Sequence, residues 1–190
     1  MKYTKRALGL LVLILIMGTG MNAFGFLGFG NTLTWQEEVK LLDGRVITVT
    51  QKRRYEGKVP RESWLTFKLA EFGNQEITWH ENLSPHVFNV HKGKLYVVGM
   101  PFTEREFRQY GRPKPSYLGY RYEAGKWQLI PFKEIPEAIY DTNLLIANDP
   151  PNGAKVVSFA IKAEELKDDS LGGLGGPLKR IDPKWNLLNY

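Results

Sequence analysis

The 190-residue sequence contains no cysteine and only three histidines. Without cysteine the chain forms no disulfide, offers no thiol nucleophile and cannot be lipidated at a lipoprotein cysteine. A chain of this length can bury an adequate core without covalent cross-links. The histidines, His80, His86 and His91, lie six and five residues apart, and this spacing matches no common zinc motif. We therefore expect no metal site and no cofactor.

Motifs of catalysis are missing as well. The serines stand in no nucleophile-elbow context, and the glycines of residues 172–176 lack the Lys-Ser/Thr pair of a phosphate-binding loop. Adjacent acidic residues such as Glu37 and Glu38 project to opposite faces of a strand, so alone they form no carboxylate pair. The sequence favours a non-enzymatic protein, with a hydrolase of widely scattered catalytic residues as a further alternative.

Charge is absent from a long stretch near the N terminus. Lys2, Lys5 and Arg6 precede residues 7–30, which carry no charged side chain. At about 1.5 Å per residue, a helix over these residues reaches roughly 36 Å, enough to cross a bilayer core of about 30 Å. The basic residues predict that the N terminus stays inside and that the chain from about residue 31 lies outside. We expect a retained inner-membrane anchor.

The alternative for this stretch is a cleaved signal peptide. Residues 7–17 suit its apolar central region, and cleavage after Gly20 or Ala23 would release the chain to the periplasm, although the Ala-x-Ala pattern is absent. A buried core helix is a third interpretation, and it is disfavoured because a core helix rarely lacks charge on every face.

Positive charge elsewhere is modest. The formal net charge is +6, and the three N-terminal cations account for half of it, which leaves +3 on the rest. Such an excess does not indicate a nucleic-acid partner. Lys52, Arg53 and Arg54 form a basic patch within residues 51–60. This patch is a candidate contact for anionic lipid headgroups or a phosphate-bearing polymer, with a solvated loop tip as the alternative.

Turn signals between apolar runs predict antiparallel hairpins. Four are expected, over residues 32–50, 63–80, 87–100 and 117–131. The first turns at Asp43-Gly44, a pair that suits a type I′ turn. A helix is predicted over residues 103–110 with Thr103 as its cap, and a last short strand over residues 144–147.

These elements predict a mainly β fold: an antiparallel meander forming a sandwich or open barrel, with one or two short helices and an N-terminal hydrophobic helix. The third and fourth hairpins share a Gly-Lys turn, so a propeller fragment is a lesser alternative. The expected parts are a signal or anchor over residues 1–30, a β-rich domain over 31–148 and a C-terminal extension over 149–190.

The C-terminal extension contains Asp182-Pro183, a pair typical of a helix start. It predicts a short terminal helix that carries Trp185 and Leu188. This tail is expected to dock on its own domain, with a partner protein as the alternative.

Aromatic residues make up 13% of the chain. Tryptophans spread along a sequence usually belong to a β-rich core and only sometimes form a ligand platform. Trp64, Tyr117 and Trp127 are the candidates for such a platform, because flat aromatic faces suit sugar rings.

A resemblance to a known family rests on four short stretches: residues 35–45 (WQEEVKLLDGR), 77–79 (ITW), 122–127 (YEAGKW) and 130–131 (IP). With them the chain resembles, over roughly residues 35–146, a family of uncharacterised exported proteins from Gram-negative bacteria. The resemblance implies a location in the cell envelope and brings no activity and no catalytic residues. Several members carry a lipoprotein cysteine after the signal. Its absence here supports a protein anchor in place of a lipid anchor.

Together these observations predict a non-enzymatic envelope protein. Its β-domain would face the periplasm, be tethered to the inner membrane and bind an unidentified protein partner. The alternative is a periplasmic ligand- or glycan-binding module that uses exposed aromatic residues.

Overall fold

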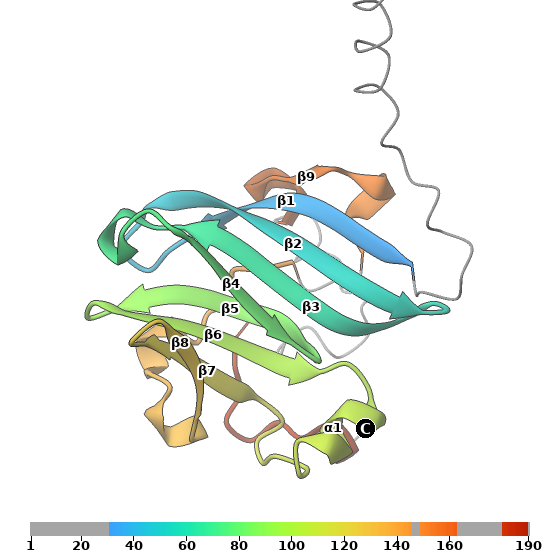
Figure 1. The fold of residues 1–190 in the computed structure, drawn as a ribbon. Helices are drawn as coiled ribbons and strands as arrows, with labels where there is room; N and C mark the ends of the chain where they lie inside the picture. The colour runs from blue at the N-terminus through green and yellow to red at the C-terminus, as the bar shows by residue number, and fades with distance from the viewer. Residues whose placement is uncertain (1–30, 146–148, 163–179, 190) are drawn as a thin grey trace, which may run out of the picture.

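The computed structural model describes residues 31–145, 149–162 and 180–189, which form two sheets packed face to face (Figure 1). Sheet A has the strand order β4-β3-β2-β1-β9, and sheet B has the order β5-β6-β7-β8. The prediction of a mainly β meander is confirmed, and its form is a sandwich. The strands are β1 (Thr32–Lys40), β2 (Val46–Glu56), β3 (Val59–Lys68), β4 (Glu76–Glu81), β5 (Leu83–His91), β6 (Lys94–Pro101), β7 (Leu118–Glu123), β8 (Lys126–Ile130) and β9 (Val156–Val157).

The first eight strands run as one meander folded in half. Every neighbouring pair from β1 to β4, and from β5 to β8, is antiparallel and consecutive in sequence. Only Asn82 separates the end of β4 from the start of β5, so the chain passes directly from one sheet to the other. Short connections favour this path because consecutive strands close the smallest loops.

The C-terminal extension completes sheet A. Strand β9 pairs in parallel with β1 through Gln36↔Val156 and Glu37↔Val157. The last strand predicted at residues 144–147 does not form over Leu144 and Leu145, and residues 146–148 lie outside the described ones. The reason is hydrogen bonding. The Leu144 amide donates to the His86 carbonyl at 3.2 Å, and the Leu145 amide donates to the Glu37 carboxylate at 2.6 Å, so neither amide joins a strand ladder.

The third and fourth hairpins form as predicted. Their turns, Lys92-Gly93 and Ala124-Gly125, have positive φ at both central positions, which is the type I′ geometry. Glycine supplies this geometry without steric cost at the second position of each turn. The two hairpins lie side by side as sheet B (Figure 1).

The first turn differs from its prediction. Five residues, 41–45, connect Lys40 to Val46, and in the Asp43-Gly44 pair only Gly44 has a positive φ. The Asp43 carboxylate accepts a hydrogen bond from the Arg45 amide at 3.0 Å, which holds the wider turn. The predicted two-residue turn is therefore wrong, although the hairpin itself is confirmed.

The complete helices among the described residues are short. Helix α1 (Glu104–Gln109) forms where predicted, and the Thr103 hydroxyl caps it by accepting a hydrogen bond from the Arg105 amide at 3.2 Å. In place of the predicted terminal helix, residues 183–184 form a turn before η6 (Leu187–Asn189). The other 3-10 helices within the described ranges are η1 (Ala70–Phe72), η2 (Phe132–Glu134), η3 (Glu137–Ile139) and η4 (Pro151–Gly153).

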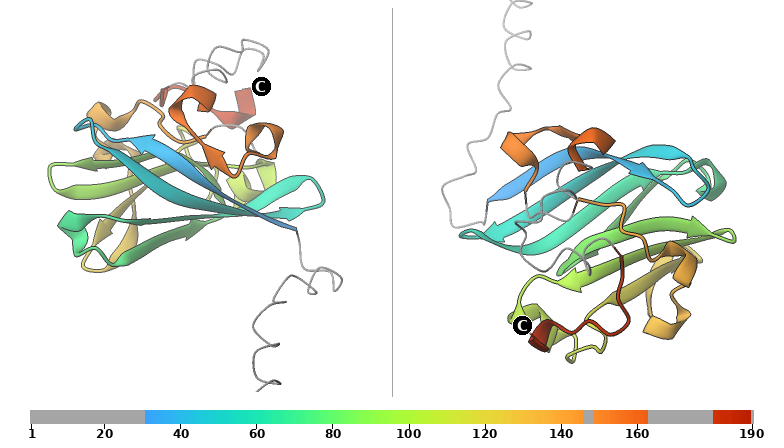
Figure 2. Two further views of the ribbon diagram at one scale, coloured as in Figure 1. Left: turned by 90° about the horizontal axis from the view of Figure 1, so that it is seen from above. Right: turned by 180° about the vertical axis from the view of Figure 1, so that it is seen from behind.

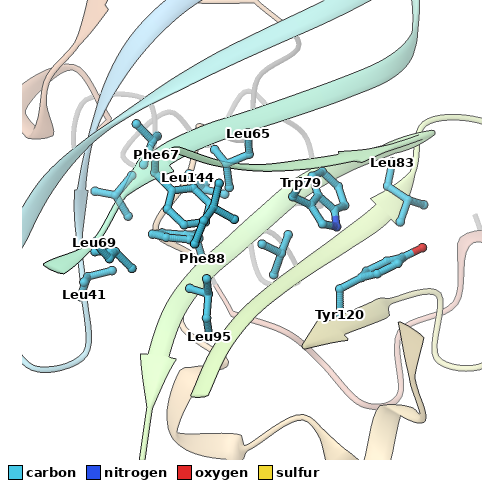
Figure 3. Packing of buried hydrophobic residues seen from close by; sticks show 14 of the residues in the cluster. Leu41, Leu65, Phe67, Leu69, Trp79, Leu83, Phe88, Leu95, Tyr120 and Leu144 are labelled. Carbon is cyan, nitrogen blue, oxygen red and sulfur yellow. The ribbon is translucent and has the colours of Figure 1, made fainter. Parts of the chain in front are cut away.

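Side chains from both sheets fill the space between them. Figure 3 shows Phe67 and Trp79 of sheet A meeting Phe88 and Tyr120 of sheet B. The centres of the Phe67 and Phe88 rings are 4.4 Å apart, and those of Trp79 and Tyr120 are 5.7 Å apart. Each such side chain stabilises the fold by roughly 1.5–3 kcal/mol through burial of apolar surface.

Sheet B is covered on its outer face as well. The run Leu95-Tyr96-Val97-Val98 of β6 is apolar without alternation because Leu95 and Val97 face sheet A while Tyr96 and Val98 face outward into a second cluster. Residues 131–141 and the C-terminal segment, residues 180–189, cover this outer face (Figure 2). We refer to residues 180–189 as the tail.

The predicted N-terminal anchor, residues 1–30, lies outside the described residues. Within the described part of the chain, no helix combines the length and apolar character needed to cross a bilayer.

Candidate functional site

The outer face of sheet B, together with the segment 131–141 that lies on it, presents an aromatic surface to the tail. We name it the tail-binding face, and it consists of Val87, Tyr96, Val98, Tyr117, Phe132, Ile139 and Tyr140. Its rings form a continuous strip. The ring centres of Tyr117 and Phe132 are 6.3 Å apart, and those of Phe132 and Tyr140 are 5.8 Å apart. Aromatic side chains are enriched at surfaces that recognise other protein chains.

Two side chains of the tail are buried against this face. Ile181 is 2% exposed and Trp185 is 6% exposed. The Trp185 ring centre lies 5.6 Å from that of Tyr117. Residues 182–184, between the two anchors, are exposed. Burial of the two side chains stabilises the docked tail by roughly 3–6 kcal/mol, so they supply most of its attachment.

Two hydrogen bonds between backbone groups and one from a backbone amide to a side chain fix the position of the tail. The Ile181 amide donates to the Tyr140 carbonyl at 2.9 Å. The Ser116 amide donates to the Trp185 carbonyl at 3.3 Å, and the Ser116 hydroxyl accepts from the Leu187 amide at 2.9 Å. Because Ser116 is fully buried, its two bonds to the tail are shielded from water.

One end of the tail-binding face is acidic. Arg180 forms an ion pair with Asp141, and its guanidinium lies 5.7 Å from the centre of the Tyr140 ring. Burial, together with the nearby Glu137 carboxylate, raises the pKa of Tyr140, so its phenol stays neutral at ordinary pH. This end therefore suits a cation placed over a neutral aromatic ring.

A second unusual group of side chains lies inside the sandwich, beside β1. Glu37 is fully buried, and its carboxylate accepts four hydrogen bonds. The donors are Trp35 Nε1 at 3.4 Å, Gln51 Nε2 at 2.7 Å, the Leu145 amide at 2.6 Å and Lys162 Nζ at 3.1 Å. A buried charge this well paired is a structural element rather than a site open to substrate.

Lys162 brings its ammonium to Glu37 from the C-terminal extension. Besides the carboxylate, Nζ donates to the carbonyl oxygens of Glu38 and, at 2.7 Å, Asn143. These three acceptors match the three donors of an ammonium group. Lys162 thus ties the extension to β1.

Arg53 and His86 extend this polar interior. The Arg53 side chain is fully buried near the rings of Trp35 and Phe102, at 5.1 and 5.8 Å from their centres. Burial lowers its pKa. Burial, and then the charge of Arg53, lower the pKa of His86 to about 4, so His86 is neutral at pH 7.

The three aromatic residues predicted as a ligand platform are not brought together. Trp64 stands on the outer face of sheet A with the His80 ring stacked at 4.2 Å and the Lys52 ammonium 4.7 Å from its ring centre. These neighbours occupy the indole, so a sugar ring would have to displace one of them.

Tyr117 and Trp127 serve packing in two other places. Tyr117 is 2% exposed and lies beneath the tail. Trp127 packs against Phe67 and Tyr122, and its indole donates to the Thr78 carbonyl at 2.9 Å. Because Tyr117 is buried and the three rings do not converge, the platform predicted from the sequence does not form.

The basic patch predicted as a lipid contact lies on a strand. Residues 46–56 form β2, so the side chains of Lys52 and Arg54 point outward while that of Arg53 points inward. Arg54 is paired with Glu62 at 2.5 Å. Arg53 has no exposed surface and cannot meet a headgroup, so the prediction is wrong for this residue. The error arises because the cluster of cations conceals the alternation of inward and outward residues. The strand in fact continues to Glu56.

The three histidines occupy unrelated positions. His80 lies on the exposed face of β4, His86 is buried on β5, and His91 ends β5. In the described ranges no group of three or more histidine, acidic or cysteine side chains is placed to hold a metal ion.

Sequence reasoning missed Ile181 as an anchor and the Glu37–Lys162 pair. For the pair, 125 positions separate the partners, so no local pattern joins them. One indication was available. Glu37 occupies the inward phase of an alternating strand, between Trp35 and Val39, where a carboxylate requires a buried partner.

Comparison with known proteins adds no assignment to this geometry. No protein-family model, curated protein or solved structure matches the chain.

Proposed function

We propose that this chain is a non-enzymatic protein of a bacterial cell envelope. Residues 1–30 hold it at the inner membrane, and its β-sandwich faces the periplasm and binds a protein partner. The basic residues ahead of an uncharged stretch support the membrane location. The polar interior does not favour catalysis, because Glu37, Arg53 and Ser63 have no exposed surface.

The observation that carries partner binding is the tail-binding face. It already holds a peptide segment through two apolar anchors, Ile181 and Trp185, and an ion pair at one end. A protein partner with an equivalent segment would meet the same aromatic strip.

The location is tested by expressing the protein with its own N terminus in a Gram-negative host, followed by intact mass and fractionation. A full-length mass in the inner-membrane fraction is expected. A soluble periplasmic product shortened by about 20 residues would contradict the anchor.

Partner binding is tested with a photo-crosslinking amino acid in the native membrane. It is placed at Lys133, an exposed residue of η2 beside the tail-binding face, and in a control at Lys68, an exposed residue of sheet A. A discrete protein adduct is expected from position 133 and not from position 68. No adduct from position 133, or the same adducts from both positions, would overturn partner binding at this face.

A further inference from the structure

The tail attaches to the sandwich in the manner of a bound peptide. Among the described residues, the tail pairs with the rest of the chain through a single bridge, Asp141↔Arg180, and adds no strand to sheet B. The tail is attached by the side chains of Ile181 and Trp185 and by isolated hydrogen bonds, whereas each strand of the meander is joined by a continuous ladder. A segment held by a few anchors can leave without breaking the sheets.

Three features of the tail meet three complementary features of the face. The Arg180 guanidinium meets Asp141 and the Tyr140 ring. Ile181 enters the apolar part of the face, and four residues later the Trp185 indole packs on Tyr117. The residues between the anchors are exposed and contribute no buried contact.

The face itself belongs to the sandwich. Three of its residues, Val87, Tyr96 and Val98, come from β5 and β6, whose backbones are fixed in the sheet. A preformed surface binds a peptide at a lower entropic cost than a surface that must first order. A peptide that presents the tail's chemistry would meet the same preformed contacts.

We propose that the tail-binding face is a peptide-recognition site, occupied here by the chain's own tail, and that the partner's peptide displaces this tail. The occupant is a partner segment with a cation, an adjacent branched aliphatic residue and a tryptophan four positions after the aliphatic residue. This inference rests on the proposed function. It specifies the chemistry of the partner's peptide and the way in which the tail regulates its binding. The tail is an internal competitor of the partner.

Tethering sets the strength of this competition. A segment linked in the same chain acts at an effective concentration on the order of millimolar. A peptide added to the intact protein therefore binds at least about tenfold more weakly than to a chain whose own anchor is removed.

The test uses a fluorescent peptide with the sequence of residues 180–189 and full-length proteins. Trp185→Ala removes the internal anchor, and Leu188→Ala, at a residue 48% exposed, is the matched control. By anisotropy, the peptide should bind the Trp185→Ala protein at least about tenfold more tightly than wild type or Leu188→Ala. A peptide with alanine in place of the tryptophan should bind none of them. Equal binding to all three proteins would contradict the proposal.

A second design retains every described side chain, in case Trp185→Ala unfolds the protein. A protease recognition sequence is inserted between residues 163 and 179, outside the described residues, and the folded protein is cut. The labelled peptide is expected to replace the cut tail. A folded, cut protein that keeps its tail and never takes up the label would overturn the proposal.

Two other outcomes are separable. A stable dimer that exchanges labelled tails between intact chains would assign the face to a second copy and reject a partner peptide. Failure of peptide exchange with a retained Lys133 adduct would reject this inference and leave the proposed function standing.

Discussion

Along the single strand β2, the interior of the sandwich changes from apolar to polar. The inward-facing residues are Ile47 and Val49 toward the first turn, and Gln51, Arg53 and Tyr55 toward the second. We refer to the apolar half as the part around Val49, Leu65, Phe67, Leu69, Phe88 and Leu95, and to the polar half as the part around Glu37, Gln51, Arg53, Ser63 and His86.

The two halves are stabilised in different ways. In the apolar half, stabilisation depends on area and volume, so substitutions that conserve volume are tolerated. In the polar half, a paired charged or hydrogen-bonding group such as Glu37 depends on its particular partner, and loss of one partner leaves the other buried without compensation. Two side chains that are equally buried can therefore differ in how much stability their substitution costs. Four predictions test this difference.

The largest effect is expected at Lys162. Lys162→Met leaves the Glu37 carboxylate buried without its cation, so the free energy of unfolding should fall by about 3–5 kcal/mol. Urea denaturation followed by tryptophan fluorescence measures this. Lys155→Met, at an exposed lysine nearby, is the control.

Replacing both partners separates pairing from packing. The double variant Glu37→Leu, Lys162→Met should lose less stability than Lys162→Met alone, because no unpaired charge remains. If Lys162→Met costs less than about 1 kcal/mol, the polar half does not depend on this pair.

The second prediction compares neighbours on β3. Leu65→Ala opens a cavity in the apolar half and should cost about 2–5 kcal/mol, whereas Leu65→Met should cost less than about 1.5 kcal/mol. Ser63 also faces inward, but its hydroxyl makes no hydrogen bond to the described residues. Ser63→Ala should therefore change the free energy of unfolding by less than about 1 kcal/mol. A cost for Ser63→Ala equal to that of Leu65→Ala would contradict the distinction.

The third prediction concerns pH and His86. The folded pKa of about 4 lies below the unfolded value of 6.5, so the unfolded chain binds the proton more readily between these values. Stability from neutral His86 is fully present above pH 6.5 and is lost as pH falls toward 4, by up to about 3 kcal/mol.

The pH prediction is measured as a difference between proteins. Urea unfolding at pH 7 and pH 4.5 should show a smaller loss for His86→Leu than for wild type, and His80→Gln, at an exposed histidine, serves as the control. If the free energy of unfolding of His86→Leu falls between pH 7 and pH 4.5 as much as that of wild type, protonation of His86 does not cause the loss of stability.

The smallest effect is expected on the solvent side of sheet A. Lys52→Ala removes the cation beside Trp64 and should cost about 0.5–1 kcal/mol in urea denaturation, because an exposed cation–π contact is weak. Lys58→Ala, at the exposed turn between β2 and β3, is expected to be neutral. A cost at Lys52 above about 2 kcal/mol would mean that this surface contributes as much as the interior.

Local rules predicted the hairpins because their determinants are local. The turns at Lys92-Gly93 and Ala124-Gly125 and the cap at Thr103 follow from residues a few positions apart. The sandwich follows from the alternation of β-strands and their short connections. These features survive in the structure because packing acts in the same direction as local preference.

The candidate site is built by contacts between residues far apart in the sequence, and the sequence-based prediction therefore missed most of it. The sequence predicts that Trp185 belongs to a tail that docks on the domain. It does not specify that the indole contacts Tyr117, nor that Ile181 is the second buried anchor. The aromatic platform failed for a related reason. The sequence gives the positions of Trp64 and Trp127, but the register of the sheets determines which side chains pack against their rings.

The contact between Glu37 and Lys162 also makes the order of synthesis matter. Strand β1, which carries Glu37, is synthesised early. The ribosome must add 125 more residues after Glu37 before Lys162, the cation that pairs with it, is present. A chain that ends after β8 but before residue 162 contains every strand from β1 to β8, yet its buried Glu37 carboxylate lacks its cation. Truncated products would then be less stable than complete ones and more readily degraded. A single ion pair in this way makes the stability of the strands depend on a residue that follows all of them in the sequence.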